Sequence, residues 1–414
     1  MTVVSGQSYE LLTAETVPAY VAGRPALRAR IDPARITRIR EVGDGNMNTV
    51  FAVEVDGGPG VVLKQSMPYV RVDPDWPITP DRNRIEATVL AEHGRVAPGL
   101  VPELYDVDEA GHVLAIEDLS DHRVWRGLLN EGRRYDGVAA DLGRYVARVA
   151  FGTSVFGLGA EAHKAAVAAS VNPELCEITE DLVFTEPYIE HEHNKILPAN
   201  EADVAAYAGD PAVRTAIGLA KLAFMTHAEA LIHGDLHTGS VLVRDTPHST
   251  RAFDVEFAFY GPVGFDIGAL WGNYVLAAAR ALALEDEEHA AWVLELPGQT
   301  WEAFQEEFTR LWPGREDPRV YGDGVLDAYL ARVQADAAAF GAAKAARRVI
   351  GFSRVTDIET LGEDLRVRAI RGVLHSARHL LTSAAPTFDR VGELLADALS
   401  GWRSRTTAAI PRTQ

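Results

Sequence analysis

Residues 232–240 read Ile-His-Gly-Asp-Leu-His-Thr-Gly-Ser, and residues 253–257 follow with Phe-Asp-Val-Glu-Phe. The first stretch places Asp235 in a tight turn inside an apolar run. The second offers Asp254 and Glu256, two positions apart. Phosphoryl transfer from a nucleotide needs a set of this kind: one carboxylate to accept the hydroxyl proton, and oxygen ligands that hold Mg²⁺. We therefore expect Asp235 to be the base, and Asp254 and Glu256 to point to the same side of a strand and bind metal.

The residues upstream predict a small β-rich region that grips a nucleotide. Strands are expected at 39–42, 49–55 and 61–65, with a glycine-containing turn at 43–48 and a hairpin turn at 56–58. The third strand carries Lys64 among apolar residues, and a lysine there can supply positive charge to the phosphates. A plain hairpin with a solvated lysine is the alternative interpretation.

The next elements predict how the chain is divided. A helix at 82–93 carries Glu86, which is either a partner for Lys64 or a solvated carboxylate. A strand at 113–116 leads into Glu117-Asp118-Leu119, where backbone groups can hydrogen-bond an adenine edge, and helical patterns dominate afterwards. We expect an α+β, two-lobed fold: residues 1–119 form a small, mainly antiparallel β lobe with helices, and residues 120–414 form a larger, mainly helical lobe.

Four other segments give weaker predictions. Helices are expected at 8–22 and 213–231. Four prolines within 67–80 argue against a regular element there, and Trp76 in this segment is either a core anchor or part of a cover that excludes water. In 191–193, His-Glu-His resembles a metal-ligand set. Because histidines two apart on a helix do not face each other, we expect a surface cluster instead.

Composition excludes several classes of protein. The chain has 414 residues with 40 basic and 59 acidic side chains, and a net charge of −19 argues against a nonspecific nucleic-acid binder. Cys176 is the single cysteine, so no intramolecular disulfide can form. The N-terminal residues lack a secretory pattern, and no apolar run reaches about 18 residues. We expect a cytoplasmic protein with no membrane segment.

Taken together, these motifs resemble the 5-methylthioribose kinases, within the kinase-like phosphotransferase superfamily. The resemblance spans roughly residues 40 to 360, and the His-Gly-Asp-Leu-His-Thr-Gly-Ser run with its downstream acidic pair is its most specific part. The segments that carry it are 43–48, 62–65, 68–71, Trp76-Pro77, 117–119, 233–240, 256–262, 264–268 and Arg347-Arg348.

This resemblance implies ATP-dependent phosphorylation of the 1-hydroxyl of 5-methylthioribose, in methionine salvage, by a homodimeric enzyme. It implies that Asp235 is the catalytic base and that Asp254 and Glu256, with Val255 between them, hold Mg²⁺. The nucleotide contacts it implies are Asn46, Lys64, Glu117, Asp118 and Leu119. Arg347 and Arg348 would reach the sugar and the transferring phosphate, and Trp76 would cover the sugar.

The alternative interpretation of Arg347 and Arg348 is that they are solvated surface residues, because arginines on an alanine-rich helix ordinarily are. Phosphoryl transfer calls for cations near the γ-phosphate. Consecutive helix residues diverge by about 100°, so one side chain should point at the reacting atoms, and we favour Arg347.

Departures from related patterns keep alternatives open. Ser240 stands where protein kinases and aminoglycoside phosphotransferases have a metal-binding Asn, and Val255 stands where we expect Pro. The segment 72–75 before Trp76 also differs, so 5-deoxyribose or another 5-modified ribose is an alternative acceptor. An aminoglycoside-, choline- or homoserine-type phosphotransferase is a second alternative. A non-catalytic nucleotide-binding protein is a third, and retention of Lys64 and the acidic residues speaks against it.

Overall fold

The computed structural model describes residues 10–42, 47–71 and 73–400. The chain forms two compact units. The first consists of Met1–His122 together with Phe253–Ala258, and the second of Arg123–Ala252 together with Phe259–Gln414. The sequence placed the division after residue 119. It did not indicate that a six-residue segment far along the chain, including Asp254 and Glu256, would belong to the first unit.

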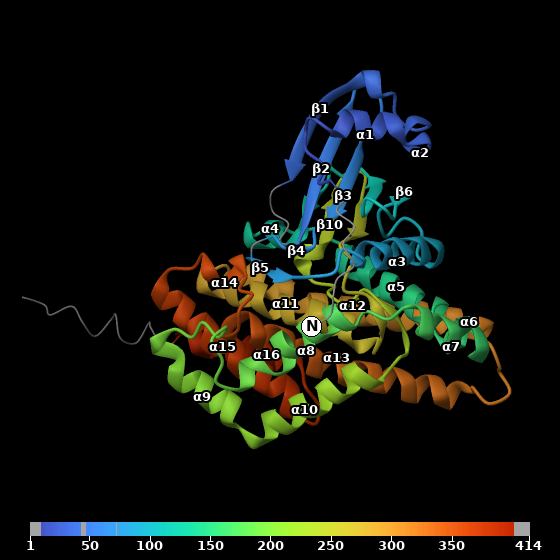
Figure 1. Ribbon diagram of the computed structural model, residues 1–414. Helices are drawn as coiled ribbons and strands as arrows, with labels where there is room; N and C mark the ends of the chain where they lie inside the picture. Colours follow the sequence, from blue (N-terminus) through green and yellow to red (C-terminus); the bar gives the residue numbers. More distant parts are fainter. Residues whose placement is uncertain (1–9, 43–46, 72, 401–414) are drawn as a thin grey trace, which may run out of the picture. The chain divides into compact units, whose positions relative to one another are not determined.

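The first unit is built on a five-stranded antiparallel sheet in the order β1-β2-β3-β7-β6 (Figure 1). Its strands are β1 (Ile36–Val42), β2 (Asn48–Val55), β3 (Val61–Ser66), β6 (Leu104–Asp108) and β7 (Val113–Glu117). In the central strand β3, Lys64 lies opposite Val50 on one side and Leu114 on the other. Because side chains alternate along a strand, Leu63 and Lys64 project from opposite faces of the sheet.

Helices cover both faces of this sheet. They are α1 (Val17–Gly23), α2 (Pro25–Arg28) and α3 (Arg82–Val96), with a short 3₁₀ turn η1 (Pro33–Arg35) before β1. Val17, Val21 and Leu27 join Leu63 in one buried apolar cluster, so α1 and α2 pack on the Leu63 face. Since Lys64 contacts Glu86 of α3, that helix lies on the other face.

Two predictions for the first unit were wrong. The leading helix begins at Val17 and not at residue 8, because Thr13 and Thr16 exchange side-chain-to-backbone hydrogen bonds in a turn and Pro18 favours a helix start. The proline-rich segment 67–80, for which no regular element was expected, does contain strands. It forms a two-stranded hairpin of β4 (Tyr69–Val70) and β5 (Asp73–Pro77). Each strand has a single partner, so the prolines need not donate to a second neighbour.

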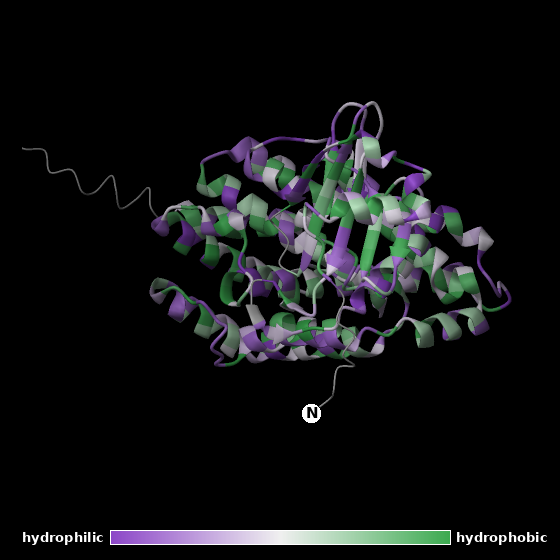
Figure 2. Cartoon of the chain, turned by 45° about the horizontal axis from the view of Figure 1, so that its top comes forward, coloured by the Kyte–Doolittle hydropathy of each residue, from purple (hydrophilic) through white to green (hydrophobic). Residues whose placement is uncertain are grey.

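The second unit is mainly helical. Hydrophilic and hydrophobic residues form bands along its helices (Figure 2), as expected for helices with one buried face. Its helices are α4 (Trp125–Asn130), α5 (Val138–Gly152), α6 (Val155–Leu158), α7 (Ala160–Ala169), α8 (Pro173–Phe184), α9 (Glu201–Gly209), α10 (Pro211–Thr226), α11 (Gly264–Ala283), α12 (Glu287–Leu311), α13 (Asp323–Ile350), α14 (Thr356–Glu359), α15 (Glu363–Thr382) and α16 (Phe388–Ser400).

Short strands and 3₁₀ turns connect these helices. The strands are β8 (Arg123–Val124), β9 (Ala230–Ile232), β10 (Val241–Arg244), β11 (Ser249–Ala252) and β12 (Phe259–Gly261), which form the sheets β11-β10-β8 and β12-β9. The 3₁₀ turns are η2 (Glu186–Tyr188), η3 (Pro198–Asn200), η4 (Thr238–Ser240) and η5 (Trp312–Gly314). The predicted helix 213–231 ends earlier, at Thr226. Leu231 instead pairs with Tyr260 in the β9–β12 ladder, which supplies backbone hydrogen bonds that a longer helix would forgo.

Small residues bring α11 and α13 close together. A Cβ added at Gly268 would lie 2.7 Å from the carbonyl oxygen of Ala337, and one at Gly272 would lie 2.5 Å from that of Gly341. The Ala-rich stretch of α13 is therefore buried against α11 and is not a solvated face. None of the helices in the described part of the chain combines the length and the apolar composition that a membrane span requires.

Candidate active site

Lys64 lies at the centre of a buried ionic group in the first unit. Its Nζ is 2.8 Å from Oε1 of Glu86 and 2.5 Å from Oδ1 of Asp254. Burial lowers the pKa of Lys64, but the carboxylates of Asp254 and Glu86 outweigh burial and raise it overall, so the ammonium stays charged. Burial also raises the pKa of Glu86, to about 7, against the opposing effect of Lys64. Of the two interpretations of Glu86, the structure therefore shows the partner of Lys64 and not a solvated carboxylate.

Asp254 has an unusual backbone. Its φ is +66°, in the left-handed region that non-glycine residues seldom adopt, and such strain concentrates at functional sites. Its side chain is 47% exposed, whereas that of Lys64 is 9% exposed, so the pair has one open side. The prediction that Asp254 and Glu256 share a strand was wrong, because residues 253–258 form a loop in which Val255 is fully buried.

Glu256 is buried and already paired. Its Oε2 accepts hydrogen bonds from Nδ2 of Asn48 at 2.9 Å and from Nε of Arg82 at 3.3 Å. Arg82 is fully buried, and it also donates to the carbonyl oxygens of Met47 and Met67. Glu256 therefore ties the loop to β2 and α3. Neither Asn48 nor Arg82 was predicted, since each acts through a partner far along the chain.

The other residues predicted to contact the nucleotide or sugar have mixed outcomes. Asn46 lies outside the described residues. Glu117 ends β7, and its N–H donates to the carbonyl oxygen of Glu103 at 2.8 Å. Asp118 accepts from the N–H of Ser120, and the Leu119 carbonyl oxygen accepts from the N–H of His122, so this segment is a defined turn. Trp76 lies in β5 and is half-buried.

In the second unit, a network of hydrogen bonds holds the loop that carries Asp235. The buried Asp266 carboxylate accepts from the N–H groups of His233, at 2.8 Å, and Gly234, at 3.0 Å. Gly234 has φ +82°, which a side chain would disfavour. The hydroxyl of Ser240 donates to the carbonyl oxygen of Asp235 and accepts from the N–H of His237. Ser240 thus closes the turn.

The carboxylate of Asp235 is paired with a lysine that the sequence analysis did not single out. Nζ of Lys344, on α13, lies 2.6 Å from Oδ1 of Asp235 and 4.5 Å from the centroid of the Phe265 ring. Burial raises the pKa of Asp235, but the basic groups around it, Lys344 first among them, together outweigh burial and hold it well below its usual range. Burial lowers the pKa of Lys344 to about 8. Asp235 is accordingly an ionised carboxylate at neutral pH.

Three guanidinium groups add to the positive charge in this region. Arg347 and Arg348 are 7% and 6% exposed, so neither is a solvated surface residue. Nε of Arg347 has no hydrogen-bond partner within the described residues, whereas Nη1 of Arg348 donates to the carbonyl oxygen and Oγ of Ser353. Burial lowers the pKa of both arginines, and the charge of Asp235 opposes that effect. Arg126 of α4 donates to Asn273 and pairs with Asp357.

This arrangement suits chemistry on an anion. Lys344, Arg347, Arg348 and Arg126 all act electrostatically on Asp235 or on its neighbours. A half-buried, ionised carboxylate such as Asp235 can orient a hydroxyl group and take up its proton, while nearby cations offset negative charge on a transferring group. The Lys64–Asp254 pair of the first unit and the Asp235–Lys344 pair of the second together indicate a class of protein, the phosphotransferases.

Comparison with known proteins supports this class and narrows it. The sequence model of the APH phosphotransferase enzyme family matches residues 38–306. A methylthioribose kinase from Cronobacter sakazakii is 39% identical over 398 residues, which cover 94% of this chain and 98% of that protein. One from Klebsiella pneumoniae is 39% identical over 406 residues, with the same coverage. Among solved structures, the match to a glucosamine kinase covers 96% of this chain and 87% of the kinase chain, at 17% identity and with a TM-score of 0.47. The chain belongs to the phosphotransferase enzyme family and, within it, to the methylthioribose kinases.

Proposed function

We propose that the protein uses ATP to phosphorylate the 1-hydroxyl of 5-methylthioribose, giving 5-methylthioribose 1-phosphate in methionine salvage. The observation that carries this proposal is 39% identity to a methylthioribose kinase across 94% of the chain. Two groups of side chains support it, Lys64 with Asp254 and Asp235 with Lys344. Each offers a carboxylate, which can bind metal or accept a proton, and a lysine, which can offset phosphate charge.

In the second unit, we assign the catalytic base to Asp235. Its low pKa makes it a weak base, so it acts first by orienting the sugar hydroxyl and then accepts the proton as the bond to phosphorus forms. Lys344 and Arg347 offset negative charge on the transferring group, and Arg348 holds the turn that follows α13. Asp266 and Ser240 keep the Asp235 loop in position.

In the first unit, we assign the nucleotide phosphates to Lys64 and Mg²⁺ to Asp254 and Glu256. Carboxylate oxygens suit this hard cation, and the partly exposed Asp254 fits a ligand role. Glu256 would act from its buried position beside Asn48 and Arg82. When bound, Mg²⁺ would neutralise charge on the phosphate oxygens. We also assign a phosphate contact to Asn46 and the adenine edge to residues 117–119.

An acceptor comparison tests the proposal. The kcat/KM with ATP should be highest for 5-methylthioribose, lower for 5-deoxyribose and lowest for ribose, because ribose would bury an unpaired 5-hydroxyl. Choline and an aminoglycoside should give no product. Preference for 5-deoxyribose would instead support the alternative raised by residues 72–75 and Trp76. Turnover confined to choline or the aminoglycoside would refute the assignment.

The Asp235–Lys344 pair predicts a pH dependence. Lys344 has a pKa of about 8, below its ordinary value, so it loses its proton as pH rises through about 8, and Asp235 then loses its cationic partner. We expect kcat/KM for the sugar to fall above pH 8. In Lys344→Arg the fall should move to higher pH, because a guanidinium stays charged. An unchanged alkaline fall in that variant would exclude Lys344 as its cause.

The two arginines of α13 should differ in their effects. Arg347→Met should lower kcat by roughly 10²–10³, the usual cost of losing one charge-stabilising donor, with little change in Tm. Arg348→Met should chiefly lower Tm, by about 2–6 °C, because the Ser353 oxygens lose a charged donor. Steady-state kinetics and thermal unfolding of both variants provide the measurement. Full activity in Arg347→Met would contradict this division of roles.

We further propose a cytoplasmic homodimer. Leu219, Leu222 and Met225 lie along one side of α10 and are 57–62% exposed, which offers an apolar face for self-association. Light scattering of the purified chain would give the mass of the assembly directly.

A further inference from the structure

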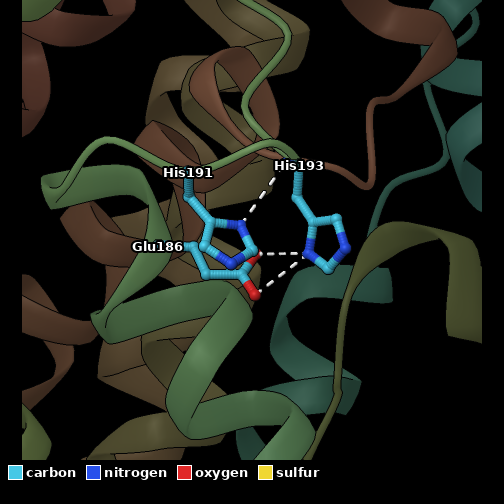
Figure 3. A group of neighbouring side chains, drawn as sticks. All are labelled: Glu186, His191 and His193. Atoms are coloured by element: carbon cyan, nitrogen blue, oxygen red, sulfur yellow. Dashed lines mark hydrogen bonds and ion pairs between the residues drawn. The ribbon is translucent and has the colours of Figure 1, made fainter.

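Three potential metal ligands converge beyond the residues assigned above. Glu186 begins η2, and His191 and His193 lie in the loop that follows it. Nδ1 of His193 is 2.9 Å from Oε2 of Glu186, and Nδ1 of His191 is 3.6 Å from the same oxygen. Figure 3 shows both imidazole rings beside this carboxylate. The expectation of a surface cluster assumes that the two histidines lie on a helix. They lie in a loop instead, and their rings face each other closely, with centroids 4.6 Å apart.

Among the described residues, the carboxylate of Glu186 pairs with His191 and His193, and a histidine is charged only when it is protonated. The Glu186 side chain is 10% exposed, and no described lysine or arginine pairs with it. A buried carboxylate is costly unless a cation or hydrogen bonds compensate for it. A second acidic group with histidine, formed by His227, Glu229 and Asp336, differs in this respect. There the guanidinium of Arg332 pairs with both carboxylates and supplies the positive charge.

We propose that Glu186, His191 and His193 bind a zinc ion, with water completing its coordination. Two imidazoles and one carboxylate form a ligand set that zinc accepts, and Mg²⁺ prefers oxygen ligands alone. Neighbouring ligand atoms around tetrahedral zinc lie roughly 3.3 Å apart, given metal–ligand bonds of about 2.0–2.1 Å. The separations of 2.9 and 3.6 Å bracket that value. The metal would take the place of the hydrogen bond between Nδ1 of His193 and Glu186, and of the one that Nδ1 of His191 accepts from the N–H of His193 at 3.3 Å.

The site would fasten the loop to the turn after α13. The N–H of Lys195 donates to the carbonyl oxygen of Ile350 at 2.8 Å, and the ring of His193 lies 5.3 Å from that of Phe352. The next residue, Ser353, is the one that Arg348 binds. Zinc at this position would therefore hold the segment against which Arg348 is ordered. This is a structural role, separate from the magnesium assigned to Asp254.

The test is titration of untagged, chelator-treated full-length protein with zinc chloride in excess Mg²⁺, followed by calorimetry. We expect one zinc ion per chain. His193→Gln and Glu186→Gln should each weaken binding at least about tenfold, since even groups that only support ligands cost 10–100-fold when lost. His375→Gln is the matched control, because His375 lies exposed on α15, and it should bind zinc as the native chain does.

Two further measurements test the proposal even if either variant folds poorly. X-ray absorption at the zinc edge of the native protein should show two imidazole ligands. Zinc should raise Tm in the native chain and in His375→Gln, but not in His193→Gln. Absence of stoichiometric binding, zinc bound only by oxygen ligands, or equal affinity in folded His193→Gln and native protein would each overturn the assignment.

Discussion

Replacing Asp235 with Asn is expected to lower kcat by about three orders of magnitude or more, while the Kd for ATP changes little. The amide keeps the size of the side chain but cannot accept the hydroxyl proton. It also breaks the ion pair with Nζ of Lys344, which lies 2.6 Å from Oδ1. The effect should therefore appear in the chemical step, and single-turnover kinetics with saturating sugar and ATP would measure it.

The matched control for this variant is Asp336→Asn. Asp336 is also a partly buried carboxylate paired with a cation, in this case Arg332, but it has no assigned part in the reaction. It should retain native kcat. If Asp235→Asn turned over at the native rate, Asp235 would not be the base, and the role of the whole Asp235 loop would have to be reconsidered.

Asp254→Asn should weaken binding of Mg²⁺–ATP by roughly 10–100-fold and also lower kcat, because a metal ligand and the partner of Lys64 are lost together. Asparagine tolerates the left-handed backbone that Asp254 adopts, so the loop should keep its shape. Calorimetric titration with ATP, with and without Mg²⁺, would separate the metal effect from the effect on the nucleotide.

In the native protein, Mg²⁺ should tighten ATP binding, and in Asp254→Asn this gain should largely vanish. Asp106→Asn is the control within the same unit, because Asp106 pairs with Arg24 away from Lys64 and should leave the Mg²⁺ effect intact. A full Mg²⁺ effect in Asp254→Asn would remove Asp254 from the metal site.

Much of the first unit could be predicted because its signals are local. Short runs typical of strands, with glycine-containing turns between them, located β2 and β3, and Lys64 stood out as a charge within an apolar strand. The order of the elements made Glu86 a candidate partner for Lys64 but left a solvated carboxylate open, and the structure shows the pair. The partners of Glu256 could not be predicted in this way, since Asn48 and Arg82 reach it only through tertiary packing.

In the second unit, the sequence itself contains a signal for the cationic cluster on α13. Lys344, Arg347 and Arg348 are spaced at i, i+3 and i+4, which places their side chains on neighbouring parts of one helix face. Their Ala-rich surroundings resemble a solvated helix, and only close packing of α11 against α13 reveals that the stretch is buried. The role of Asp266 depends on hydrogen bonds to a loop 32 residues away in sequence, which no local pattern indicates.

The most direct test of the proposed reaction is to identify its product. Phosphorus NMR of a reaction with ATP and 5-methylthioribose should show one phosphate ester on the anomeric carbon for each ADP formed. Formation of ADP with free phosphate and no sugar phosphate would contradict the account, as would an ester at another hydroxyl.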